Sequence, residues 1–226
     1  DHIFYGYKGD IQSDTVLSLK EGTLTIADYA LENTYGITEI QLPDGLTTIG
    51  SFVAFGSKDL EKVNIPASVT DISEFAFVGC DTLKEINVDP KNPNYSSVDG
   101  VLFNKDRTKL IHCPNRDFES YIIPNTVKEV EKFAFSNSNL SEVKVYNDDV
   151  VFDDCAVGIN MKAFYFSDNS YKAEVKYVGF EDGITSVGNN IFNGFGNIET
   201  ITWGNAIEKI GVNSFKDCNK ITSIEL

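Results

Sequence analysis

Apolar and polar residues form short blocks that return along the chain at a fixed interval. Each block has the form apolar-x-x-apolar-x-apolar, and the alternation at its end is typical of a half-buried β-strand. Three consecutive copies lie 23 residues apart: Ile37-Thr-Glu-Ile40-Gln-Leu42-Pro43, Leu60-Glu-Lys-Val63-Asn-Ile65-Pro66 and Leu83-Lys-Glu-Ile86-Asn-Val88. A fixed interval of this length indicates a repeat architecture in which each copy is one structural unit.

The block returns later in the chain, and each copy carries a second half. The later copies are Leu140, Val143 and Val145, then Ile198, Ile201 and Trp203, and then Ile221, Ile224 and Leu226. Weaker copies are Asp14, Leu17 and Leu19, and Phe118, Tyr121 and Ile123. The second half has the form Ile-Gly-x-x-Ala-Phe-x-x-Cys, as from Ile72 through Ala76 and Phe77 to Cys80.

This pattern predicts a solenoid. Each unit gives a short strand, a Pro or Gly turn, a second extended stretch and a tight helical or turn segment. No unit could bury its apolar positions alone, so stacking of neighbouring units into internal ladders supplies the stability. At one position the ladder is interrupted, because the Phe slot falls on Ala54 between Phe52 and Phe55. We expect one of these rings to shift inward or a void to remain.

The units resemble the BspA-like leucine-rich repeats of bacterial and protozoan surface proteins. The family pattern is similar to Leu-x-x-Ile-x-Leu-Pro-x-Ser-Val-Thr-x-Ile-Gly-x-x-Ala-Phe-x-x-Cys, and the stretch from Leu60 to Cys80 matches most of it. Residues 92–111 also resemble the hairpin insert of this family, and the resemblance covers roughly residues 14–226. It implies a β-rich repeat solenoid with short helical or turn segments, a leucine-rich repeat right-handed superhelix.

Two interruptions divide the repeats within one predicted domain, residues 1–226. A hairpin insert is expected at about 90–115, with Val101–Phe103 and Lys109–Ile111 as its strands and residues 104–108 as a polar turn. From about 148 to 180 the repeat degrades. There the spacing between Met161 and Val175 is too short for a full coil, which favours a simple hairpin turn around residues 167–171.

The charge of the chain excludes several kinds of partner. Nineteen Lys and Arg against 34 Asp and Glu give a net charge of -15, which disfavours nucleic acids and anionic lipid surfaces. No apolar run approaches the length needed to cross a bilayer, and the first residues lack the order of a signal peptide. We therefore expect no direct membrane insertion.

The histidines and cysteines form no catalytic or metal-binding pattern. No Cys-x-x-Cys pair occurs, and only Cys80 and Cys218 occupy the repeat's Cys slot, where we expect small buried side chains. Cys113 and Cys155 fall outside that slot, and either could be exposed. His112 is adjacent to Cys113, but neighbours on a strand point to opposite faces. We predict no catalytic residue, no metal ligand and no cofactor.

One acidic cluster has the residue types of a calcium site. Asp148, Asp149, Asp153 and Asp154 supply carboxylate oxygens, the ligands that calcium prefers. Their spacing fits no calcium loop, so a solvated acidic loop is the favoured interpretation.

Outward-facing strand residues provide the candidate binding surface. Strand residues alternate between core and surface, so each coil contributes two outward side chains to one continuous sheet. The series begins with Glu39 and Gln41, Lys62 and Asn64, and Glu85 and Asn87. It later places Ile122, Tyr165 and Tyr177 outward, with Lys144 between them. Exposed aromatic residues are typical of interfaces, so these four residues form the predicted patch. The alternative is that the insert or the irregular section covers them.

The resemblance implies an extracellular or cell-surface binding module that is not an enzyme. Its expected ligand is a protein, such as a host extracellular-matrix or surface protein. A structural spacer that displays another domain and a carbohydrate-binding accessory module are the alternatives. The chain ends in the repeat strand Ile221–Leu226 without a polar cap. We expect either further residues in the native protein or self-association through this uncapped C-terminal repeat.

Overall fold

The structure is a computed structural model. It describes residues 2–7, 11–115, 120–136, 138, 142–145, 151–152, 177–180, 186–187, 192–205 and 207–222. The chain divides into two compact units: unit 1 is Asp1–Arg107 with Ile111–Asn115, and unit 2 is Thr108–Leu110 with Arg116–Leu226. The single domain expected from the sequence stays a prediction.

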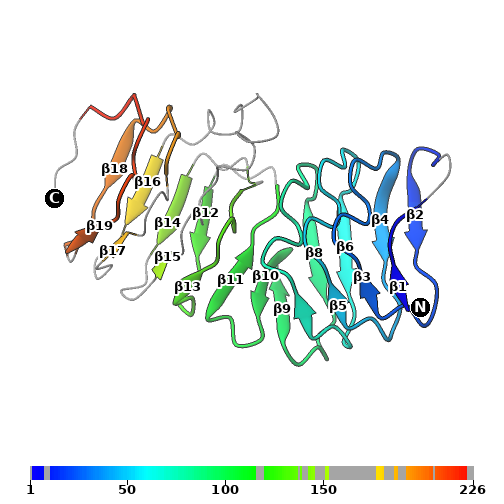
Figure 1. Cartoon of the computed structure of the whole chain (residues 1–226). Coiled ribbons are helices and arrows are strands. Elements are labelled where there is room, and N and C mark those ends of the chain that lie inside the picture. Colours follow the sequence, from blue (N-terminus) through cyan, green and yellow to red (C-terminus); the bar gives the residue numbers. More distant parts are fainter. Residues whose placement is uncertain are drawn as a thin grey trace. The chain divides into compact units, whose positions relative to one another are not determined.

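Unit 1 contains a parallel sheet built from the first strand of each coil (Figure 1). Its members are, in spatial order, β2 (Thr15–Ser18), β4 (Ile37–Gln41), β6 (Lys62–Ile65) and β8 (Glu85–Val88). Glu39 pairs in register with Lys62, and Lys62 pairs with Glu85, so each step is one repeat. The predicted interval therefore sets the strand register directly.

The second half of each coil forms a separate parallel ladder of two-residue strands in unit 1. This ladder consists of β1 (Ile3–Phe4), β3 (Thr25–Ile26), β5 (Thr48–Ile49) and β7 (Asp71–Ile72). Ile26, Ile49 and Ile72 follow one another in register and are all buried. The predicted second extended stretch is confirmed. The segments predicted to be helical or turns are turns in the structure. Among the described residues, no helix is long and apolar enough to cross a membrane.

The hairpin insert is present, with one more strand than expected. Its antiparallel pair is β9 (Tyr95–Val98) and β10 (Val101–Asn104). The tight turn between them is Asp99-Gly100, where both residues have positive φ (49° and 75°), as a type I′ turn requires. The strands predicted near Val101 and Lys109 correspond to β10 and β11 (Lys109–His112). The additional strand β9 was missed.

Unit 2 repeats the same two-ladder plan. Its longer strands are β12 (Ser120–Ile123), β14 (Glu142–Val145), β16 (Tyr177–Phe180) and β18 (Thr200–Thr202), all parallel. Its two-residue strands are β13 (Glu129–Val130), β15 (Val151–Phe152), β17 (Ser186–Val187) and β19 (Lys209–Ile210). Glu129 and Val130 of β13 pair in parallel with Lys109 and Leu110 of β11. On its other side β13 pairs with β15, and β17 pairs with β19. Both units are therefore β-solenoid segments built from the same two parallel ladders.

The interrupted Phe slot at Ala54 keeps a small void. Ala54 and Phe55 are both buried, and the Phe55 ring lies against Gly79 of the next coil. A residual cavity of ≈ 10 Å³ remains between Ala54 and residues such as Val63 and Phe77. Phe52 instead stacks with Phe75 at 5.4 Å between ring centroids. The void expected as one outcome is therefore present, about as small as one water molecule requires, and the buried Phe55 ring does not line it.

Candidate binding site

An open groove lies on the outward face of the long-strand sheet of unit 1. Its volume is ≈ 390 Å³, and it follows the C-terminal ends of β4, β6 and β8. The residues that line it are Glu39, Gln41, Leu42, Asn64, Ile65, Pro66, Asn87, Val88 and Asp89. Equivalent positions of three successive coils therefore build the groove.

A row of amide side chains crosses the coils on the groove surface. Gln41, Asn64 and Asn87 are neighbours in register. Asn87 Nδ2 donates to Asn64 Oδ1 at 3.4 Å, and Asn64 Nδ2 donates to Glu39 Oε1 at 2.7 Å. Ser18 extends the row, because its hydroxyl donates to Gln41 Oε1 at 2.8 Å. These bonds hold the polar side chains in fixed orientations, which lowers the entropy lost when a ligand binds.

The adjacent outward row carries charges, and its lysine is paired. Lys62 Nζ lies 3.1 Å from Glu85 Oε1. Glu39 occupies the same row one coil earlier. Lys62 itself does not line the groove. The charged side chains in the lining are the carboxylates of Glu39 and Asp89, and the lining contains no basic side chain.

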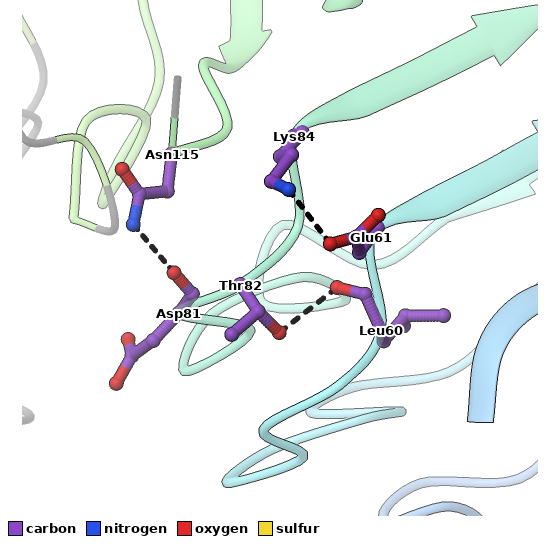
Figure 2. A network of polar contacts seen from close by, with 6 residues as sticks. All are labelled: Leu60, Glu61, Asp81, Thr82, Lys84 and Asn115. Carbon is purple, nitrogen blue, oxygen red and sulfur yellow. Dashed lines mark hydrogen bonds and ion pairs between the residues drawn. The ribbon is translucent and has the colours of Figure 1, made fainter. Parts of the chain in front are cut away.

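Contacts at the opposite, N-terminal ends of β6 and β8 join the coils (Figure 2). Lys84 Nζ lies 2.7 Å from Glu61 Oε1, and Thr82 Oγ1 donates to Leu60 O at 3.0 Å. Figure 2 also shows Asn115 Nδ2 donating to Asp81 O at 2.6 Å. These contacts fix successive coils side by side, so the strand ends that line the groove keep one spacing.

Comparison with known proteins identifies the repeat. A family model described as "BspA type Leucine rich repeat region" matches the sequence in six copies, over residues 3–116, 111–167 and 148–226. The chain belongs to this family. None of the curated proteins matches this BspA-type chain significantly.

Solved structures share the fold of this BspA-type chain. A leucine-rich repeat protein from Eubacterium ventriosum is 22% identical, with a TM-score of 0.68, and the match covers 91% of this chain and 59% of that one. A leucine rich cell surface protein from Faecalibacterium prausnitzii is 26% identical, with a TM-score of 0.66 and coverage of 93% and 59%. The pneumococcal vaccine antigen PcpA is 21% identical, with a TM-score of 0.59 and coverage of 96% and 70%. The BspA-type chain thus spans 59% of the first two solved chains.

The patch predicted from the sequence lies in unit 2 of the BspA-type chain and is only partly described. Ile122 is 53% exposed and pairs in register with Lys144, whose other neighbour is Gly179. Tyr177 pairs in register with Glu142. The side chains of Lys144 and Tyr177, and all of Tyr165, lie outside the described residues. The patch stays a prediction.

Exposed tyrosines at the start of unit 1 were missed by the sequence reasoning. Tyr5, Tyr7, Tyr29 and Tyr35 are all exposed, and Tyr5 is 69% exposed. Tyr29 stacks on Phe52 with ring centroids 5.1 Å apart. For Tyr29 the sequence did contain a signal. Tyr29, Phe52 and Phe75 are spaced 23 residues apart, and each lies two positions before the Phe slot of its coil.

The buried titratable groups among the described residues lie outside the groove. Burial lowers the pKa of His112 to about 4, and its Nε2 has no hydrogen-bond partner within the described part of the chain. Burial, followed by the charge of Asp81, raises the pKa of Cys80 to about 12. Cys80, Cys113 and Cys218 form no disulfide among the described residues and all three are buried, so the exposure allowed for Cys113 does not occur. Cys155 lies outside the described residues.

No group of three or more His, Cys, Asp or Glu side chains in the described ranges could hold a metal ion. The acidic residues Asp148, Asp149, Asp153 and Asp154 lie outside those ranges. Their assignment to a solvated loop therefore stays a prediction.

Proposed function

We propose that this BspA-type chain is a non-catalytic module that binds protein ligands at a bacterial cell surface or after secretion. The observation that supports the proposal is the groove of ≈ 390 Å³ on the strand face of unit 1. Its side chains are pre-oriented by bonds between coils, and His112 and Cys80, whose pKa values are strongly shifted, do not line it. This arrangement suits recognition rather than acid–base chemistry.

The relatives support the location. One solved relative is a leucine rich cell surface protein and another is a pneumococcal vaccine antigen. Host extracellular-matrix or surface proteins are the finer proposal for the ligand, which makes adhesion the role of the module.

The test is binding of the whole immobilised chain to purified extracellular-matrix proteins and to a glycan array. Asn64→Arg places a long side chain in the groove, so we expect at least tenfold weaker binding of any protein ligand. Glu74→Arg is the matched control, because Glu74 is exposed beside β7 and does not line the groove. Circular dichroism checks that both variants fold.

Two results would overturn the proposal. One is binding that Asn64→Arg and Glu74→Arg leave equally strong, which would remove the groove from the function. The other is binding to glycans alone, which would favour the carbohydrate-binding alternative.

A further inference from the structure

The groove has a charge that restricts its ligand. Its lining contains Glu39 and Asp89 and no Lys or Arg, within a chain of net charge -15. Of the lysines around it, Lys62 forms an ion pair with Glu85, and Lys105 Nζ donates to Pro90 O at 3.0 Å. A cationic ligand would therefore gain attraction both from the groove and from the field of the whole chain.

The hydrogen-bonding groups of the groove also favour a cationic ligand. Glu39 Oε1 accepts from Asn64, and Asp89 Oδ1 accepts the backbone N–H of Lys91 at 2.7 Å. The second oxygen of each carboxylate and Asn87 Oδ1 have no bonding partner among the described residues. These oxygens can accept hydrogen bonds from a ligand that carries N–H groups.

The floor of the groove is apolar. Ile65 and Pro66 are buried, and Leu42 and Val88 are half-buried beside them. Such a floor contacts the aliphatic stem of a lysine side chain while the ammonium group stays at the wet rim near a carboxylate. A simple inorganic cation would use the carboxylates but leave this apolar floor uncovered.

The amide row sets the length of the ligand. Gln41, Asn64 and Asn87 stand on three adjacent strands, and two steps of about 4.8 Å span about 10 Å. An extended peptide rises about 3.3 Å per residue, so the row faces about three residues. Amide side chains can both donate to and accept from peptide groups.

We propose that the groove binds an extended, lysine-bearing peptide segment, whose backbone contacts the amide row and whose ammonium groups pair with Glu39 and Asp89. This inference rests on the proposed function, since it names the ligand class of the same groove. Lysine recognition thereby distinguishes the basic segments of a protein ligand from its acidic ones.

The experiment measures fluorescence anisotropy of labelled peptides with the whole chain. The probes are short alternating Lys-Ala and Glu-Ala peptides of equal length. We expect the lysine peptide to bind and the glutamate peptide not to bind. Glu39→Gln and Asp89→Asn each preserve side-chain shape, and each is expected to weaken binding about threefold to fivefold. Raising the salt concentration from about 0.05 to 0.5 M is expected to weaken it further.

Control variants separate the groove from general charge attraction. Asp71→Asn and Glu74→Gln remove exposed carboxylates outside the groove and should leave the affinity within twofold. Equal weakening by all four variants, or equal binding of both peptides, would overturn the inference. If Asn64→Arg blocks a protein ligand that Glu39→Gln and Asp89→Asn still bind at full strength, the proposed function stands and only the lysine preference fails.

Discussion

Gly79 is the residue on which the packing of the Phe55 ring depends. Its φ is +78°, a region that residues with a side chain rarely adopt. A Cβ there would overlap Phe55 Cδ2 and lie 2.6 Å from Cε2. Because Phe55 is buried and packs edge-on against Phe52, its ring has little room to retreat.

We expect Gly79→Ala to lower the free energy of unfolding by about 2–4 kcal/mol, from backbone strain and the forced movement of the ring. Urea denaturation followed by circular dichroism measures the change. Gly45→Ala is the control, since no atom lies within 4 Å of a Cβ at that position, and it should change stability by less than about 1 kcal/mol. Equal effects of the two variants would show that the Phe55 packing does not constrain this coil.

At the scale of elements, a single side chain ties the hairpin insert to the regular coils. Asn92 is completely buried before β9. Its Nδ2 donates to the carbonyls of Pro66 and Val69, both at 2.9 Å, and its Oδ1 accepts the N–H groups of Asn94 and Tyr95. One amide therefore satisfies four backbone groups.

Asn92→Ala would leave these backbone groups without partners in a buried site, at an expected cost of about 3 kcal/mol in the free energy of unfolding. Asn94→Ala provides the comparison, because Asn94 is exposed and donates one side-chain bond, to Thr70 O. That change should cost less than about 1 kcal/mol. Thermal unfolding of both variants tests the prediction, and a loss for Asn92→Ala no larger than for Asn94→Ala would contradict it.

The elements differ in how far the sequence specified them. Alternation along residues 39–41, 62–64 and 85–87 correctly predicted the outward strand positions, because every coil repeats the same inward slots. Strand β9 was missed although the Asp99-Gly100 pair is a strong hairpin signal. The groove could not be derived, since it depends on bonds between coils and on where Pro66 and Asp89 stand after the strands.

At the scale of the whole molecule, acidification has two opposing effects. The chain has a net charge of -15 at pH 7 and a pI of ≈ 4.4, so lowering the pH reduces its self-repulsion, which by itself favours the folded state. His112 acts in the other direction. Its pKa of about 4 in the folded state lies below the ordinary 6.5, because burial disfavours the charged form.

The unfolded chain therefore binds a proton at His112 that the folded chain does not bind between pH 6.5 and 4. The stability associated with the neutral ring is complete above pH 6.5 and is lost progressively as the pH falls to 4, to a total of about 3 kcal/mol. His112→Leu removes this proton and should flatten the pH profile of the free energy of unfolding. The exposed His2 provides the control substitution, His2→Leu. Urea denaturation at several pH values between 7 and 4.5 measures the profiles. Parallel losses in the parent chain and in His112→Leu would show that protonation of other groups, rather than of His112, governs the acid stability of the solenoid.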